Sequence, residues 1–399
     1  MTRVFLRFSS LLLPLLTLVV TGCADETPDV EQEPLQGAYA FDELPGTIPM
    51  PETPEDRPVM ESRVKLGRYL FYDNRLSGNQ TQSCSSCHAQ EKAFTDGRKV
   101  GLGSTEEEHV RNPMSLTNVA YNNTYGWVSP SVTSLEDQAG IPLFGESPVE
   151  LGLAHMDQDV VLERFRKEPL YQELFADAYP ELPREERITM NHIISAIADF
   201  ERTLLSFDSP YDRYVYGGDA DALNDSEKRG MELFFSERLE CFHCHGGFNF
   251  SDAVSHEGLA FVTQPFHNTG LYNVDFEGGF PARDRGLFDL TGNPDDMGRF
   301  KAPTLRNIEV TAPYFHDGSA ATLEDVIAHY ERGGRAIVEG EDLGDGAKNP
   351  HKSELIQGFI LTESERTDLL AFLKSLTDET FLTDPRHAKP DDLPAITQD

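Results

Sequence analysis

Two short stretches, ECFHCHGG at residues 240–247 and SCSSCHAQ at residues 83–90, decide how this chain is interpreted. Both contain a pair of cysteines separated by two residues, with a histidine directly after the second cysteine. The residues concerned are Cys84, Cys87 and His88 in the first half, and Cys241, Cys244 and His245 in the second. Only one further cysteine, Cys23, lies outside these motifs. The repetition predicts one functional centre in each half of the chain.

A Cys-x-x-Cys-His motif is typical of covalent haem c attachment, in which both cysteines bind the porphyrin and the histidine ligates iron. Zinc ribbons bring their cysteine pairs together over a short loop, and the pairs at 84/87 and 241/244 are far apart. A redox dithiol or a disulfide would not need a histidine at the same place twice. The motifs therefore predict two covalently bound haem c groups, and His243 is expected to be incidental.

The N-terminus, MTRVFLRFSSLLLPLLTLVVTGC, has the features of a bacterial lipoprotein signal. Arg3 and Arg7 precede a short apolar segment, and the sequence VTGC ends at Cys23. We expect residues 1–22 to be removed and Cys23 to carry lipid on the periplasmic side of a bacterial membrane, with the outer membrane favoured. The alternative is an ordinary secretion signal and a soluble periplasmic protein. Both interpretations predict export, which suits haem c.

The charge of the chain limits its partners. It has 34 Lys and Arg residues against 68 Asp and Glu residues, which gives a formal net charge of −34. Such a protein repels phosphate backbones, so nucleic acid is not expected as a partner. The acidic surface would attract a basic redox protein, or it would simply keep an exported protein soluble. These two explanations remain open.

The pattern along the chain predicts a mainly α fold with long loops and few strands. Apolar residues recur at helical spacing in residues 191–207, at Ile193, Ile197, Phe200 and Leu204. Thr322 and Gly333 are expected to begin and end one helix, and Thr362 with Glu365 is a capping box for another. Further helices are expected at residues 59–77, 157–179 and 226–238.

The expected organisation has five segments. We predict two cytochrome c-like haem domains, with the haems near the domain interface. In order, the segments are the signal at 1–22, an acidic proline-rich tether at 23–58, an N-terminal haem domain at 59–217, a C-terminal haem domain at 218–380 and a polar tail at 381–399.

Segments before, between and after the two motifs resemble the bacterial dihaem cytochrome c peroxidases and their MauG relatives. The resemblance extends from about Val59 to Thr377. The phrases PLFGESPVELGL and HNTGLYN are most similar to the MauG-like, MbnH-type branch. The resemblance is carried by LGRYLFYDNRLS, CSSCHAQEKAFTDG, RNPMSLTNVAYN, SLEDQAGIPLFGESPVELG, ERTLLSFDSPYDRY, FKAPTLRNIEVTAPYFHDGSAATLEDVIAHYERGG and LLAFLKSL.

This resemblance implies that the first haem is the peroxide site, with Gln138 and Glu150 on its open face. A carboxylate there can move a proton between the oxygens of peroxide, and an amide can orient the peroxide. The interval to Glu150 is two residues longer than is usual in the family, so Glu146 is an alternative. His109 lies near a family loop that closes the first iron in some members, and we expect it at the surface.

For the second haem, the resemblance implies that Tyr330 is the sixth ligand, where the peroxidases have methionine. A phenolate is a hard anionic donor that lowers the reduction potential of iron and stabilises its high-valent state. The rival ligand is Met297. Trp127, the only tryptophan, matches the family position between the haems and is expected to carry oxidising equivalents from one iron to the other.

The family also holds a calcium ion between its haems. The matching positions are the Asn112 side chain and the backbone carbonyls of Thr311 and Pro313, an all-oxygen set that suits Ca²⁺. His316 and Asp317 match a segment near the second haem and are expected to be structural.

The function implied is that of an exported dihaem oxidoreductase that reacts with hydrogen peroxide and, through high-valent haem iron, oxidises a partner protein. The alternative is a cytochrome c peroxidase that reduces hydrogen peroxide to water with electrons from a small cytochrome or copper protein.

Overall fold

The computed structural model describes residues 36–41, 44–54 and 57–396, and the residues from Gly37 onward belong to one compact unit. The signal predicted for residues 1–22, the lipid attachment predicted at Cys23 and most of the tether lie outside the described residues. Within the described ranges, every helix is too short or too polar to cross a membrane.

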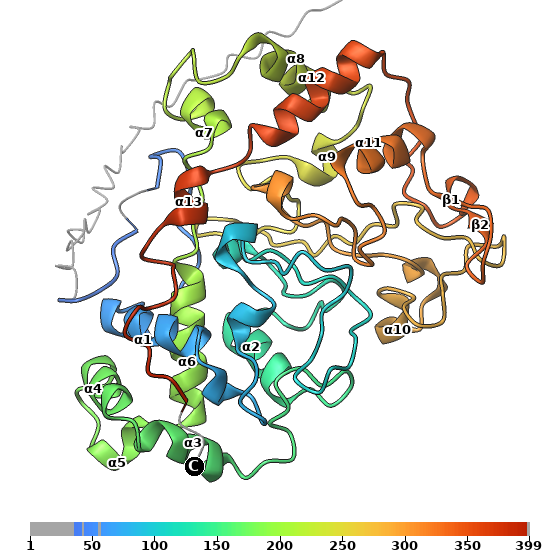
Figure 1. The fold of residues 1–399 in the computed structure, drawn as a ribbon. Helices are drawn as coiled ribbons and strands as arrows, with labels where there is room; N and C mark the ends of the chain where they lie inside the picture. Colours follow the sequence, from blue (N-terminus) through green and yellow to red (C-terminus); the bar gives the residue numbers. More distant parts are fainter. Residues whose placement is uncertain (1–35, 42–43, 55–56, 397–399) are drawn as a thin grey trace, which may run out of the picture. The chain divides into compact units, whose positions relative to one another are not determined.

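The first half of the compact unit is built from six helices joined by long loops and short 3₁₀ turns (Figure 1). The Cys84 motif lies in one of these turns, at Cys84–Ser86. The helices are α1 (Glu61–Phe71), α2 (Leu135–Phe144), α3 (Gln158–Arg166), α4 (Pro169–Ala178), α5 (Arg184–Arg187) and α6 (Met190–Arg202).

The second half contains seven more helices and one two-stranded hairpin, so the described residues confirm the mainly α fold class. Strands β1 (Ala336–Ile337) and β2 (Gly344–Asp345) pair antiparallel. The helices are α7 (Pro210–Val215), α8 (Asp225–Phe234), α9 (Phe242–His245), α10 (Phe288–Thr291), α11 (Leu323–Arg332), α12 (Glu363–Lys374) and α13 (Glu379–Thr383).

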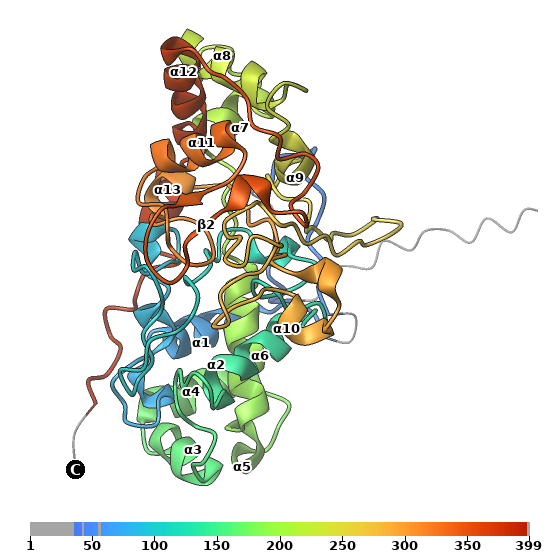
Figure 2. The same ribbon diagram turned by 90° about the vertical axis from the view of Figure 1, so that its right-hand side faces the viewer.

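The same glycine-mediated helix crossing occurs in both halves. In the first, α1 lies against α6, and in the second α8 lies against α12 (Figure 1 and Figure 2). A Cβ atom at Gly67 would lie 1.8 Å from the Ala196 carbonyl oxygen, and one at Gly230 would lie 1.9 Å from that of Asp368. Only glycine permits such an approach. In each crossing the helix that carries the glycine precedes the Cys-x-x-Cys-His motif and its partner helix follows the motif, so the two motifs are supported in a similar way.

Most local expectations are confirmed. Thr322 caps α11 and Gly333 ends it with a φ of 74°, while Thr362 and Glu365 form the capping box of α12. The stretch 157–179 forms two helices instead of one, because Pro169 cannot continue the i to i−4 ladder and instead starts α4. Leu204 is buried as expected, although it lies beyond the end of α6.

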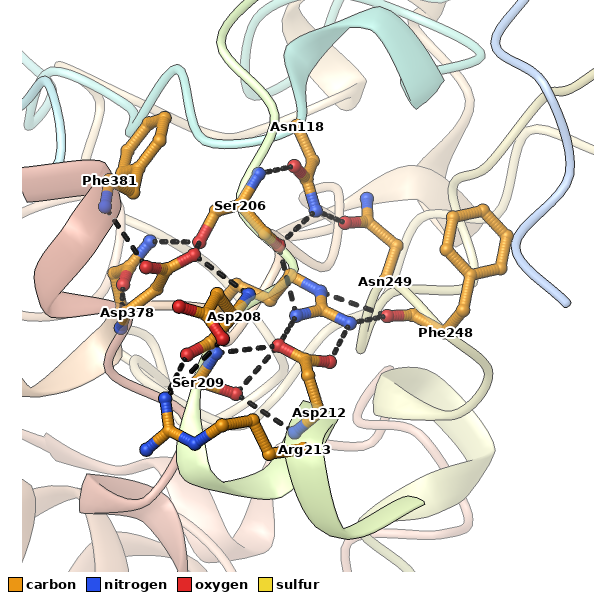
Figure 3. Close-up of polar contacts among 12 residues, drawn as sticks. Asn118, Ser206, Asp208, Ser209, Asp212, Arg213, Phe248, Asn249, Asp378 and Phe381 are labelled. Carbon is orange, nitrogen blue, oxygen red and sulfur yellow. Dashed lines mark hydrogen bonds and ion pairs between the residues drawn. The ribbon is translucent and has the colours of Figure 1, made fainter. Parts of the chain in front are cut away.

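A buried polar network joins the two halves (Figure 3). The Arg306 side chain, with none of its surface exposed, pairs with Asp212 through contacts of 2.8 and 2.9 Å. It also donates to the carbonyl oxygens of Ser206 and Phe248. Asn118 of the first half receives the Ser206 N–H at 2.7 Å and donates to Asn249 of the second at 3.1 Å. Phe248 and Asn249 directly follow the second motif, so the network ties the segment after that motif to Asn118 and Ser206 of the first half.

The segment after α13 contacts the first half. The Tyr69 hydroxyl donates to Asp392 at 2.6 Å, and the Tyr72 hydroxyl donates to the carbonyl oxygen of His387 at 2.8 Å. Arg75 also donates to the carbonyl oxygen of Pro394 at 3.1 Å. The polar composition of this segment therefore serves hydrogen bonds to α1 and to the turn that follows it.

Candidate active site

The second motif lies at one wall of a largely apolar cavity of about 210 Å³. Helix α8 and its following turn present Cys241, and the short helix α9 carries Cys244 and His245. The opposite side comes from α11, from the segment 300–305 and from residues 311–316. Apolar side chains that line it include Leu239, Leu305, Ile308, Leu323, Ile327 and Leu369. A flat apolar cofactor edge would be desolvated by these side chains.

Both motif histidines have one ring nitrogen fixed by a backbone carbonyl. Nδ1 of His88 lies 2.7 Å from the Phe94 oxygen, and Nδ1 of His245 lies 3.1 Å from the Phe250 oxygen. A carbonyl can only accept, so Nδ1 carries the proton and Nε2 is left as the free ligand atom. Burial lowers the pKa of both rings, which favours the neutral form that iron requires.

The four motif cysteines form no disulfide in the described structure. Together with the fixed histidine tautomers and the apolar cavity, this donor set fits covalent haem c and does not fit a disulfide. His243, next to Cys244, is exposed, and its Nε2 lies 2.8 Å from Glu240.

The structure separates the two candidate ligands of the second haem. Tyr330 of α11 lines the same cavity as Cys241, Cys244 and His245. Met297 is not among the residues that line it, and instead packs against the cluster of Phe280 and Phe300. Burial raises the pKa of Tyr330 well above its usual value, so a phenolate there needs a bound cation to stabilise it. Ferric iron would provide that charge.

Trp127 also lines this cavity. Its indole Nε1 donates to the carbonyl oxygen of Asn112 at 2.8 Å, and its ring centroid lies 6.3 Å from that of His316. His316 is buried, and burial lowers its pKa to about 4, so it is a neutral ring beside the indole. The indole is thus held in one orientation at the wall of the second site.

The first motif has a half-buried acid, Glu150, nearby. The Ser104 N–H donates to the Glu150 carbonyl oxygen at 2.8 Å, and Cys87 Sγ contacts the Leu102 carbonyl oxygen of the same loop at 4.0 Å, so Glu150 lies on a segment that packs beside the first motif. Burial raises the pKa of Glu150 to about 7. Glu146 behaves differently, because its side chain is 65% exposed and lies 3.6 Å from His155. Of the two candidate acids, Glu150 is the one next to the motif.

Gln138 and His109 have less distinctive surroundings. Gln138 is half-buried on α2, the helix that precedes the loop carrying Glu150. His109 is also half-buried, and its Nε2 is enclosed with no hydrogen-bond partner among the described residues. The expectation of a surface residue therefore does not hold for His109, because the loop 101–109 folds back on itself at the Gly101 carbonyl.

The three residues matched to calcium line one cavity. Asn112, Thr311 and Pro313 all line the cavity that holds the second motif. Nδ2 of Asn112 donates to the carbonyl oxygen of Arg98 at 2.6 Å, which leaves Oδ1 as the atom that could face a cation. Such an oxygen-only arrangement fits Ca²⁺.

Two buried charged groups near the motifs were not predicted from the sequence. Lys301 is buried in the cavity wall, where burial lowers its pKa to about 7, and its Nζ donates to the Thr124 carbonyl at 2.7 Å. Glu201 of α6 is also buried, and burial raises its pKa to about 8. Lys301 lies in FKAPTLRN and Glu201 lies in ERTLLSF, two segments that resemble the family. The sequence does not distinguish them from ordinary surface charges, and only their burial in the fold does.

Comparisons with known proteins identify the family of this chain. Residues 61–221 match the family model described as "Di-haem cytochrome c peroxidase". The chain is 33% identical to methylamine utilization protein MauG of Methylorubrum extorquens, over 90% of each chain. It is 35% identical to cytochrome-c peroxidase IdrP1 of Pseudomonas sp. (strain SCT), over 84% of this chain and 86% of that protein.

A solved structure described as a MauG-like protein associated with microbial copper homeostasis is similar throughout. It matches with a TM-score of 0.86 and 48% identity, and covers 88% of this chain and 99% of its own. These relatives are oxidoreductases of one family whose members carry two haem c groups and react with hydrogen peroxide and a protein partner. The chain therefore belongs to the dihaem cytochrome c peroxidase and MauG family of enzymes.

Proposed function

We propose that this enzyme uses hydrogen peroxide to oxidise a tryptophan or tyrosine side chain on a partner protein, as a MauG-like member of its family. The observation that carries the proposal is the position of Tyr330. Its side chain lines the cavity that also contains His245, whereas Met297 does not line this cavity. A phenolate ligand lowers the potential of the second haem and favours storage of an oxidising equivalent, whereas a thioether favours the reduced iron of an electron relay.

The first site would react with peroxide. The haem bound there supplies an open iron, and the chain supplies proton movement and orientation. Glu150 would take a proton from one peroxide oxygen and return it to the other, and Gln138 would orient the molecule. Trp127 would pass oxidising equivalents towards the second site. Calcium at Asn112, Thr311 and Pro313 would hold the segments between the sites in place.

We further propose that the protein acts outside the cytoplasm. The support is the signal sequence, in which the VTGC box at Cys23 predicts a lipid anchor on the periplasmic side of the membrane, with the outer membrane favoured. The division into haem domains at residues 59–217 and 218–380 is part of the same proposal.

A second candidate function is peroxide removal with electrons from a small cytochrome or copper protein. It is favoured by the similarity to a relative named cytochrome-c peroxidase, at 35% identity. The first-site chemistry would be the same, and the difference lies in where the electrons come from.

Steady-state peroxide turnover with a reduced small c-type cytochrome as donor separates these functions. The proposal expects slow turnover for the wild-type protein, and fast, saturable turnover would support the second candidate instead. Cyanide binding to the same ferric preparation tests whether Tyr330 is the ligand of the second haem iron. The wild-type protein should bind cyanide at one iron, and Tyr330→Phe should bind cyanide at both irons. Met297→Leu is the matched control and should bind cyanide at one iron, as the wild type does.

A further inference from the structure

A continuous row of aromatic rings begins at Trp127, passes His316 and Phe300 in the cavity wall and continues to Phe280 and Tyr272, which do not line the cavity. His316 stacks on Phe300 with ring centroids 3.6 Å apart and an interplanar angle of 12°. Phe300 lies 6.3 Å from Phe280, and Phe280 lies 5.3 Å from Tyr272. Most of these rings belong to one buried cluster against which Trp127 packs. Of the rings beyond Trp127, a phenol is by far the most easily oxidised, so the row has one redox-capable end.

Tyr272 has a base in contact with its hydroxyl. The hydroxyl donates to Oδ2 of Asp317 at 2.6 Å. Burial raises the pKa of Asp317, but neighbouring charges and hydrogen bonds, including those of Arg335 and Tyr272, bring it below its usual value. Asp317 is therefore a carboxylate that can receive a proton. This is the arrangement that proton-coupled oxidation of a phenol requires, since a phenol that keeps its proton is far harder to oxidise.

Two arginines determine which oxidised form the site can hold. The guanidinium of Arg335 lies 4.3 Å from the centroid of the Tyr272 ring, and that of Arg283 lies 5.9 Å from it. Such cations stabilise the neutral ring and would oppose a positive charge on it. Loss of an electron must therefore accompany loss of the proton to Asp317, and the product is a neutral radical.

Tyr272 lies one side-chain layer below the surface. Its own side chain is buried, with 5% of its surface exposed. Arg283, whose guanidinium lies over the Tyr272 ring, is 48% exposed and pairs with Asp342 in the loop between β1 and β2. Leu271, its neighbour in the chain, lines the cavity of the second motif. Tyr272 thus lies between the haem cavity and the solvent.

We propose that Tyr272 is a redox-active residue through which the oxidising equivalents leave the buried site towards a reductant at the protein surface. This inference rests on the proposed function for its physiological oxidant, hydrogen peroxide. In each step, one electron moves from Tyr272 towards the oxidised centre at Trp127 and the haems, the phenol O–H bond breaks, and the proton moves to Asp317. An external donor then returns one electron to the radical, and Asp317 returns the proton. Two such steps supply both electrons that peroxide takes.

The test uses the holoprotein, labelled with ring-deuterated tyrosine and frozen at intervals after one equivalent of hydrogen peroxide. We expect an organic-radical EPR signal that narrows with the label, that is lost in Tyr272→Phe and that is weakened in Asp317→Asn. Tyr121→Phe is the matched control, because Tyr121 is equally buried but donates to the Pro49 carbonyl, which cannot accept a proton. A wild-type radical that survives in Tyr272→Phe, or a peroxide-oxidised protein with no tyrosyl signal, would overturn the role of Tyr272.

A light-driven ruthenium photo-oxidant in solution separates this inference from the proposed function. It removes one electron from the protein surface without peroxide. A tyrosyl radical that forms under light in the wild type and is absent from Tyr272→Phe would support the redox role of Tyr272. This holds even if peroxide fails to oxidise the protein, because that failure would contradict only the proposed function. Equal radical yields from the wild type and Tyr272→Phe under light would contradict the inference.

Discussion

The two Cys-x-x-Cys-His sites share a frame and differ in what faces them. Each follows a helix that crosses another at a glycine, Gly67 in one half and Gly230 in the other, and each histidine is fixed by a carbonyl oxygen a few residues ahead. The first site has the half-buried acid Glu150 on a segment that packs against the loop in contact with Cys87. The second has the phenol Tyr330 in its cavity. We propose that one attachment design supports two chemistries, and that the side chain facing each haem determines which.

In the proposed function, the first site moves protons and the second site stores an oxidising equivalent. A carboxyl group whose pKa is about 7 can both take and return a proton near neutral pH. A buried phenol can instead close an iron with a negative ligand and hold it in an oxidised state. Variants that alter one site at a time, or the buried polar network that joins the two halves, test this contrast.

The largest effect is expected from Glu150→Gln. The amide keeps the shape of the side chain but cannot move a proton, so the rate of the peroxide reaction should fall by about 10²–10⁴-fold. The wild-type rate should rise with pH through about 7, because the base form of Glu150 becomes populated there. Stopped-flow mixing with peroxide across this pH range measures both effects.

Glu146→Gln is the matched control, since Glu146 is exposed at the other end of the same loop. It should keep the wild-type rate and pH profile. If Glu146→Gln were the slow variant instead, the assignment of the acid would be wrong.

Arg306→Met should damage both sites together. It leaves the Asp212 carboxylate buried without its partner, which typically costs about 3–5 kcal/mol of stability. Denaturant unfolding of the holoprotein measures the loss. The double variant Arg306→Met/Asp212→Leu removes both charges and should recover much of it. A fully stable single variant would show that the network of Figure 3 does not join the halves.

Tyr330→Met should change the second site only. A thioether in place of a phenolate should raise the second haem potential by on the order of 0.1 V or more, within the roughly 0.8 V span that axial ligands cover. Spectroelectrochemical titration resolves the two haems. The first haem should keep its potential, and an unchanged second potential would exclude Tyr330 as a ligand.

Asn112→Ala should have the smallest effect. Loss of one side-chain oxygen is expected to weaken calcium binding about tenfold, or about 1.4 kcal/mol. Isothermal titration of the calcium-depleted protein with Ca²⁺ gives the affinity. Binding equal to that of the wild type would place the ion elsewhere.

Local sequence rules predicted the parts of this molecule that depend on neighbours in the chain. The motif residues, the caps of α11 and α12, and the buried face of α6 are all set by spacing within a few residues. The resemblance to the family added Tyr330 and Glu150, which local patterns do not distinguish from other tyrosines and glutamates.

Features that depend on distant contacts were not predictable in this way. Glu146 and Glu150 are chemically alike, and only the fold shows that the first is exposed and the second is half-buried. Arg306 and Asp212 are ordinary charges in the sequence, yet they form a fully buried pair. The ring row that ends at Tyr272 combines residues from four separate segments, so no periodicity could indicate it.

The response of the purified, fully ferric protein to one equivalent of hydrogen peroxide tests the central claim, that the second site stores oxidising equivalents. Optical and EPR spectra should show reaction without prior reduction, and both ferric signals should disappear together into a long-lived state. Tyr330→Phe should lose that state. If the wild type instead reacted only after one haem had been reduced, the second site would be an electron relay and the role given to Tyr330 would be wrong.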